Sequence, residues 1–150
     1  NEVNDRLNFV VLLDSHLQLL ANHKILAALA RSCGEDTTLF YVKHPDDRND
    51  YSSFGEEITH SKIELSRCLI FGNNSSVVLQ YGALGFDVCL YEKSDFIDNS
   101  ILVKDPNKFE FKSYGGIKFV YFNSKISADF WKSFICAMGE DCLTKIKEHI

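Results

Sequence analysis

The sequence predicts an α/β domain with a mostly parallel sheet and helices on both faces. Short apolar runs, typical of strands buried on both sides, alternate with segments in which apolar residues recur at helical spacing. Small polar residues or a proline follow these runs, where the chain would leave the sheet. The first half of the chain therefore repeats strand and helix in turn, which requires parallel strands joined by crossover helices. The expected arrangement is a three-layer, Rossmann-like domain.

The expected elements of the first half follow from these patterns. Strands are expected at residues 8–14, 37–43, 68–71 and 86–91, and helices at residues 17–33 and 61–67. A further helix follows the third strand, with Asn74 or Ser75 as its N-cap and Gly85 at its end. Residues 46–55 are polar and are expected to form a loop that has no core of its own.

The pattern is looser in the second half. A short strand is expected at residues 101–103, and amphipathic helices are expected at 127–138 and 141–149. Residues 109–122 hold two aromatic runs around a Gly-Gly pair, which fit either a β-hairpin or a single strand after a loop. No internal repeat or linker interrupts the chain, so residues 1–150 are interpreted as one domain.

The charge and the hydropathy of the chain argue against a nucleic-acid partner and against a transmembrane segment. The net charge is −5 and lysine and arginine form no cluster, so a nucleic-acid partner has little electrostatic support. No apolar run approaches the ~20 residues that span a bilayer, and no leader segment is visible. We therefore expect a cytoplasmic protein with no transmembrane segment and no nucleic-acid partner.

Cysteine and histidine spacing gives no sign of a cofactor. The five cysteines stand at positions 33, 68, 89, 136 and 142. They are odd in number and form no C-x-x-C pair, so reduced core thiols are the expected interpretation. The five histidines lack the i, i+4 or cysteine-paired spacing of metal ligands. No metal and no other cofactor is expected.

Polar side chains follow the first three expected strands, at the edge where parallel strands present their carboxyl ends. They are Asp14 after the first strand, His44 and Pro45 after the second, and Asn73, Asn74, Ser75 and Ser76 after the third. In open parallel sheets, ligands bind in the crevice beyond these strand ends. Hydroxyl groups and free helix N–H groups gathered at one point suit an anion, and most naturally a phosphate. We therefore expect a phosphate-binding site at this edge.

Each of these residues also has a simpler interpretation. His44, kept extended by Pro45, can donate to a phosphate oxygen or protonate a leaving group, or it can be a loop histidine bonded to a backbone carbonyl. Asp14 can act as a base or bind a ligand hydroxyl, or it can cap the first long helix. Residues 73–76 can simply cap and hydrate a helix. Glu92, after the fourth strand, can bind a ribose hydroxyl or can be a solvated surface acid.

Several well-known motifs are absent. The chain has no G-x-G-x-x-G and no G-x-x-x-x-G-K-[ST], which argues against dinucleotide and P-loop sites. It has no G-x-S-x-G, which excludes the nucleophile elbow of α/β-hydrolases. A receiver domain would carry a phosphorylatable aspartate after its third strand, and Asn73 stands in that place. These classes are therefore set aside.

The combination of two short motifs resembles the C-terminal, donor-binding half of GT-B-type glycosyltransferases. His44-Pro45 is followed by Asn73-Asn74-Ser75-Ser76 and then by Gly85-Phe86-Asp87-Val88. The bacterial sialyltransferase and polysialyltransferase groups share a His-Pro pair and, further on, a Ser-Ser or Ser-Thr pair. CDP-glycerol polymer transferases have a similar His-Pro followed by an Asp-Tyr-Ser-Ser turn. The resemblance covers about residues 9–92 and depends on order, spacing and topology together.

The resemblance implies a site for a nucleotide-activated sugar, with CMP-sialic acid as the leading donor and a bacterial surface glycan as the acceptor. It implies that His44 contacts the nucleotide phosphate and serves as general acid, while Ser75 and Ser76 hold the phosphate or the sugar carboxylate. The sialyltransferase groups also have an acidic Asp/Glu-Asp/Glu-Gly motif. Gly55-Glu56-Glu57 has the wrong order and follows His44, so the base is either Asp14 or a residue of an N-terminal half.

The chain opens at Asn1 and its only methionine is Met138, so we expect it to be a piece of a longer protein. A GT-B site lies between two domains, and the resemblance therefore implies a missing N-terminal domain, weak nucleotide binding and no transferase activity alone. In the full protein, peripheral association with the inner face of the membrane is compatible with this function. The alternatives are a non-catalytic α/β interaction module, half of a UDP-sugar epimerase, or a CDP-polyol transferase.

Overall fold

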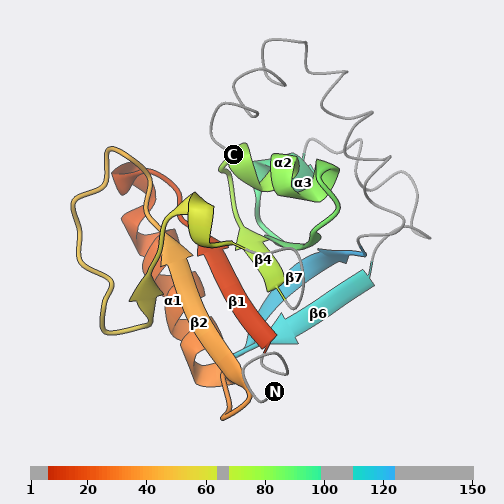
Figure 1. Ribbon diagram of the computed structural model, residues 1–150. Helices are drawn as coiled ribbons and strands as arrows, with labels where there is room; N and C mark the ends of the chain where they lie inside the picture. Colours follow the sequence, from red (N-terminus) through yellow and green to blue (C-terminus); the bar gives the residue numbers. More distant parts are fainter. Residues whose placement is uncertain (1–6, 64–67, 99–109, 124–150) are drawn as a thin grey trace.

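The computed structural model describes residues 7–63, 68–98 and 110–123. Within these ranges one seven-stranded sheet has the order β3-β2-β1-β4-β5-β7-β6 (Figure 1). The strands are β1 (Leu7–Leu12), β2 (Thr37–Val42), β3 (Glu56–Glu57), β4 (Cys68–Gly72), β5 (Asp87–Tyr91), β6 (Glu110–Tyr114) and β7 (Ile117–Phe122). The pairs from β3 through β5 are parallel, whereas β7 runs antiparallel to both β5 and β6.

Helices pack on both faces of this sheet. They are α1 (Leu19–Ser32), α2 (Val77–Ala83) and the short α3 (Asp95–Asp98), with 3-10 turns η2 (His16–Gln18) and η3 (His60–Lys62). The central strand β1 shows how the layers form, because its buried side chains alternate between two cores. Phe9 and Val11 pack in the core that holds the apolar face of α1, and Val10 packs in the core that holds α2. The predicted three-layer α/β class is confirmed.

The loop after β2 contributes to the core, so the expectation of a loop without core residues was wrong. Tyr51 is fully buried, and its ring packs edge-to-face on Tyr41 with the centroids 5.8 Å apart. Its hydroxyl donates to the carboxylate of Asp47, which is itself buried. A polar sequence can therefore carry one buried aromatic side chain whose hydroxyl is satisfied by a hydrogen bond within the same loop. Residues after this loop form β3, which had not been expected.

Two helix boundaries differ from expectation. The helix expected at residues 61–67 is instead the 3-10 turn η3, after which Ile63 is extended; residues 64–67 lie outside the described ranges. The expectation that Asn74 or Ser75 caps the helix after the third strand was also wrong. Helix α2 begins at Val77, and its N-cap residue makes no side-chain hydrogen bond. The glycine expected at its end, Gly85, has φ +103°, as a C-terminal glycine allows.

Residues 110–122 form the hairpin that was one of the two alternatives. Tyr114 pairs with Ile117, and the two loop residues between them, Gly115 and Gly116, have φ 57° and 83°. Both dihedrals are positive, as a type I′ turn requires, and glycine adopts them without steric cost. The strand expected at 101–103 and the helices expected at 127–138 and 141–149 lie outside the described residues.

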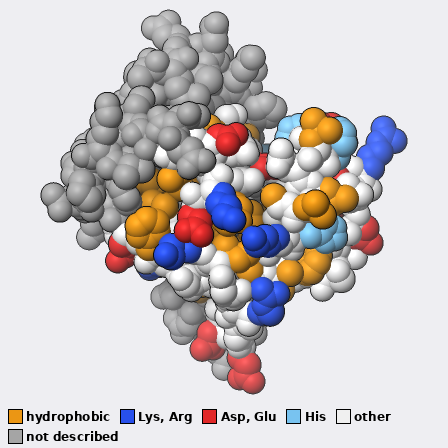
Figure 2. Space-filling model, turned by 180° about the vertical axis from the view of Figure 1, so that it is seen from behind, with side chains coloured by type: hydrophobic (Ala, Val, Ile, Leu, Met, Phe, Trp, Pro, Cys, Tyr) orange, Lys and Arg blue, Asp and Glu red, His pale blue; other side chains and the backbone are white. Residues whose placement is uncertain are grey.

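The surface is mixed in character. On the face seen in Figure 2, basic side chains lie among acidic and hydrophobic ones. Among the described residues, the most exposed large apolar side chains are Leu17, in η2, and Leu20, in the first turn of α1. In the described part of the chain, no helix has the length and apolar character needed to cross a bilayer.

Candidate functional site

The site lies where the direction of strand addition reverses. From β1 the chain adds β2 on one side and then β4 on the other. The connections on either side of this point diverge to opposite faces of the sheet, which leaves a crevice beyond the carboxyl ends of β1 and β4. At the end of β4, a Cβ on Gly72 would lie 2.9 Å from the side chain of Val78. This glycine therefore allows α2 to begin directly against the strand end.

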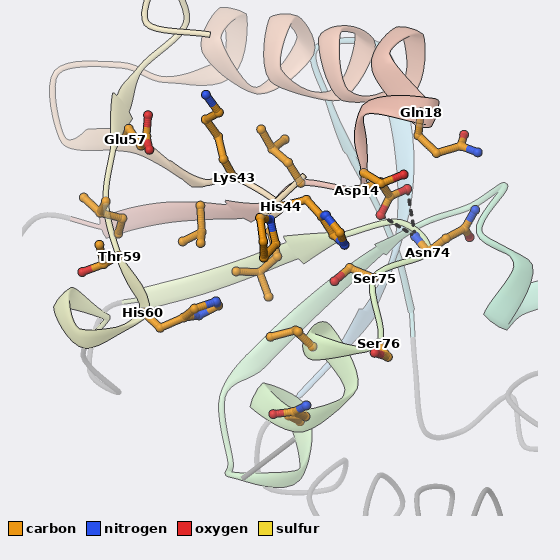
Figure 3. Close-up of a pocket in the computed structure, with 18 of the residues that line it drawn as sticks. Asp14, Gln18, Lys43, His44, Glu57, Thr59, His60, Asn74, Ser75 and Ser76 are labelled. Atoms are coloured by element: carbon orange, nitrogen blue, oxygen red, sulfur yellow. Dashed lines mark hydrogen bonds between the residues drawn. The ribbon is translucent and has the colours of Figure 1, made fainter. Parts of the chain in front are cut away.

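A pocket of about 790 Å³ opens at this point, and we refer to it as the switch-point pocket (Figure 3). Its volume lies within the range of small-molecule sites. Its apolar wall includes Leu12, Leu13, Val42, Pro45, Ile58 and Val77. Its polar lining consists of Asp14, Ser15, Gln18, Lys43, His44, Glu57, Thr59, His60, Asn74, Ser75, Ser76, Gln80 and Asp95.

The structure brings His44 and both serines to this one pocket. Figure 3 shows the His44 side chain directed toward Ser75 and Asn74. His44 follows β2 and the serines precede α2, so residues more than thirty positions apart in the chain meet because their strands flank β1. The His44 side chain and the Ser75 hydroxyl therefore face the same space, and Ser76 lines the pocket next to them.

Asp46 fixes the orientation of the His44 ring. The Nδ1 of His44 lies 2.7 Å from the Oδ1 of Asp46. The same carboxylate accepts a 3.4 Å hydrogen bond from the backbone N–H of His16. Desolvation raises the pKa of Asp46, but the hydrogen bonds from His16 and His44 outweigh it, and the net pKa is lowered. Asp46 is thus a carboxylate near neutral pH, and the backbone-carbonyl interpretation of His44 is replaced by this side-chain pair.

Asp14 holds the turn that carries the serines. Its carboxylate accepts hydrogen bonds from the Asn74 backbone N–H at 3.1 Å and from Asn73 Nδ2 at 3.0 Å. Desolvation by burial raises the pKa of Asp14, although the hydrogen bonds from Asn74, Asn73 and the Ser75 backbone, and the charge of His44, lower it in part. The hydrogen bonds that join Asp14 to α1 are made by its backbone, which exchanges two 3.0 Å bonds with the Asn22 side chain. The interpretation of Asp14 as a helix cap was therefore wrong.

The other side of the same turn is held by the segment after β5. The Asn74 Oδ1 accepts from the backbone N–H of Asp95 at 2.8 Å, so it caps α3 rather than α2. The hydroxyl of buried Ser94 donates to the backbone carbonyl of Asn73. Asn73 itself is buried behind the pocket and does not line it, and its Oδ1 has no partner among the described residues. The turn is thereby braced on two sides, which leaves the serine hydroxyls at the pocket.

Glu92 does not join the other predicted site residues. It lies at the end of β5 and is absent from the lining of the switch-point pocket. Its backbone N–H donates to the carbonyl of Lys118, on the antiparallel part of the sheet. The expectation of a ribose contact from Glu92 therefore has no support in the geometry. The acidic residue that this connection does bring to the pocket is Asp95.

Several pocket residues were not identified from the sequence. Lys43 could have been noticed, because it directly precedes the His-Pro pair. Glu57 belongs to a two-residue strand, too short for any periodicity. Gln80 sits on an apolar face of α2, 1% exposed, and its Oε1 has no partner among the described residues. Nothing in the sequence around His60 indicates a site residue. Its Nδ1 lies 2.6 Å from the hydroxyl of Tyr81, a residue twenty-one positions further along the chain.

The pocket is suited to a polar anionic ligand that also carries an apolar or aromatic part. Lys43 and the two histidines supply positive charge or N–H donors, the serines supply hydroxyls, and Asp14 and Glu57 supply acceptors for ligand hydroxyl groups. Among the described residues, no group of three His, Cys, Asp or Glu side chains is placed to hold a metal ion. Comparisons with known proteins add nothing to this geometry: no family model, no curated protein and no solved structure matches the chain significantly.

Proposed function

We propose that this domain binds a nucleotide-activated sugar in the switch-point pocket, as the donor-binding half of a GT-B-type glycosyltransferase. The observation that carries the proposal is the meeting of His44, oriented by Asp46, with Ser75 and Ser76 at one edge of the sheet. An imidazolium and two hydroxyls can surround a phosphate, and hydrogen bonds to a charged group are the strong ones. CMP-sialic acid is the leading donor, and a bacterial surface glycan is the proposed acceptor.

The proposed reaction is a direct displacement at the anomeric carbon. The bond from this carbon to the phosphate oxygen breaks, and the oxygen keeps the electron pair. The acceptor hydroxyl oxygen forms the new bond to the carbon, and its proton passes to a base. His44, when protonated, donates to the departing phosphate, and Ser75 and Ser76 stabilise the charge that develops there.

The base is proposed to come from the N-terminal domain of the full protein rather than from Asp14. Both Asp14 oxygens already accept hydrogen bonds from the turn, and taking a proton there would weaken the bonds that hold Asn73 and Asn74. Asp14 remains within reach of the pocket, so it can also receive a hydroxyl of the bound sugar. Peripheral association of the full protein with the inner face of the membrane is part of the same proposal.

Calorimetric titration of the 150-residue domain with nucleotides tests the proposal. We expect saturable binding of CMP, weakened about tenfold or more in His44→Ala and in Ser75→Ala, since each variant removes a contact to a charged group worth ~1.5 kcal/mol or more. Ser53→Ala, an exposed serine in the loop before β3, is the matched control and should bind as the parent does.

The same titration separates the alternatives. A preference for UDP would favour half of a UDP-sugar epimerase, and a preference for CDP would favour a CDP-polyol transferase. No response to CMP, CDP or UDP would overturn the proposal in favour of a non-catalytic interaction module, and so would equal binding by the parent, His44→Ala and Ser75→Ala.

A further inference from the structure

We propose that Gln80 recognises the base of the bound nucleotide, at the end of the switch-point pocket that lies beside α2. The identification of the ligand group as a base rests on the proposed function. The need of the Gln80 carboxamide for a partner from the pocket is independent of it, because that need follows from burial and hydrogen bonding alone.

The carboxamide of Gln80 is buried without a protein partner. The residue is 1% exposed, and its Oε1 accepts no hydrogen bond from any described residue. Buried polar groups in folded domains are nearly always hydrogen-bonded, so such an oxygen calls for an explanation. Asn73 Oδ1 is also unpartnered among the described residues, but Asn73 does not line the pocket, whereas Gln80 does. The pocket is therefore the space from which a hydrogen-bond donor can reach Gln80.

The position of Gln80 within the pocket follows from its neighbour on α2. Figure 3 shows Asp14 on one side of His44 and His60 on the other. The residue after Gln80 is Tyr81, whose hydroxyl lies 2.6 Å from Nδ1 of His60. Gln80 therefore belongs to the end of the pocket that His60 lines, away from Asp14.

Apolar side chains contribute to this end of the pocket. Val42, Ile58 and Val77 all line it, and all three belong to or pack against the core that holds α2. Val77 lies three positions before Gln80, on the same face of the helix. A nucleobase has two apolar faces and a polar edge, so it suits an apolar wall that carries one amide. A sugar, which carries hydroxyls around its ring, is better matched by the polar residues at the Asp14 end.

The spacing along the chain matches a nucleotide. Ser76 directly precedes α2 and Gln80 lies four residues further on, which corresponds to a rise of about 6 Å along a helix. One ribose separates the phosphate of a nucleotide from its base by a comparable length. A phosphate held by Ser75 and Ser76 would therefore place its base near Gln80. A carboxamide offers an acceptor beside a donor, and the hydrogen-bonding edge of a pyrimidine presents the complementary pair.

Thermal unfolding without any ligand tests whether the amide is unsatisfied. Gln80→Met keeps the length of the side chain and removes the buried polar group, so it should raise the melting temperature by about 2–4 °C. The matched control is Gln18→Met, the same change at the chain's other glutamine, which is exposed and makes no capping hydrogen bond to α1. This control should melt as the parent does. An unchanged or lower melting temperature in Gln80→Met would mean that the carboxamide is satisfied within the protein, and would overturn the inference.

Titration with CMP and with ribose 5-phosphate tests the contact to the base. Ribose 5-phosphate keeps the sugar and the phosphate of CMP but lacks the base. Gln80→Met should weaken CMP binding about tenfold and leave ribose 5-phosphate binding unchanged, because only CMP carries the group that Gln80 contacts. Ser75→Ala should weaken the binding of both ligands, because both carry the phosphate.

The outcomes of this titration separate the inference from the proposed function. If Gln80→Met binds CMP with the parental affinity, or loses CMP and ribose 5-phosphate equally, the base contact is overturned while the proposed function stands. If the parent binds neither ligand, the proposed function is refuted and the base contact with it, even where Gln80→Met melts at the higher temperature.

Discussion

Asp14→Ala is expected to lower the free energy of unfolding by about 2 kcal/mol, because it leaves one buried and one part-buried donor without an acceptor. These donors are the backbone N–H of Asn74 and the Nδ2 of Asn73. The turn would lose one of its two braces, so the serines that follow would no longer have a fixed position. Urea unfolding measures the loss. An alanine variant as stable as the parent would show that the carboxylate does not hold the turn.

Asp14→Asn provides the matched comparison. The amide oxygen of the new side chain can still accept from the Asn74 N–H. If the Asn73 amide turns over, the new amide nitrogen can donate to Asn73 Oδ1, which has no partner among the described residues of the parent. This variant should therefore keep the hydrogen bonds of the turn and lose only the buried charge. It should also bind CMP at least as tightly as the parent, because a negative charge leaves the switch-point pocket.

The difference in stability between Asp14→Asn and the parent should depend on pH with a definite sign. Burial raises the pKa of Asp14 in the folded state above its ordinary value of 3.8. The folded protein then binds more protons than the unfolded chain, so the contribution of Asp14 to stability falls as the pH rises from the unfolded through the folded pKa. The stability of Asp14→Asn relative to the parent should therefore increase between acid and neutral pH. A decrease over that interval would mean that the ionised carboxylate stabilises the fold.

Gly115→Ala is expected to lower the free energy of unfolding by about 3 kcal/mol, the largest effect on stability that we predict. A Cβ at this position would lie 2.1 Å from the carbonyl oxygen of Ala28, on α1, so the hairpin and the helix would have to separate. The φ of 57° adds strain of ~1 kcal/mol for any residue with a side chain. Separation would also break the 2.8 Å hydrogen bond from Arg31 to the Gly115 carbonyl.

Gly116→Ala separates the cost of a positive φ from the cost of the steric clash with α1. Its φ is 83°, so it carries a similar conformational cost, but a Cβ there would have no heavy atom within 4 Å. We expect a loss of only ~1 kcal/mol, measured by the same chemical denaturation. Equal losses in the two variants would show that the hairpin does not pack against α1 as closely as the structure has it.

The elements that could be predicted from the sequence are those whose pattern is local. The apolar run of β1 and the helical periodicity of α1 each mark one element, and their alternation is sufficient to predict a parallel sheet. The place of His44 beside Ser75 also followed, because parallel topology brings all carboxyl ends of strands to one edge. The Gly-Gly pair indicated a hairpin but could not exclude a single strand.

The parts that could not be predicted depend on contacts between distant segments. Asn74 has the composition of a cap for the helix that follows it, yet its side chain caps α3, because the segment after β5 returns to the same edge. Tyr51 lies in a polar loop, and its ring is buried against Tyr41 and His23, which lie on other elements. His60 became a site residue through Tyr81, a partner on another element. Such pairings have no local signature.

The central claim is that one anion site lies at the switch point, between the turn before α2 and the end of β2. Backbone amide NMR of the labelled domain during titration with CMP tests it most directly. We predict saturable shifts that are largest at residues 44–46 and 73–77, with the hairpin at 110–122 unaffected. Saturable shifts centred on the hairpin, or no saturable shifts at 44–46 and 73–77, would contradict the account.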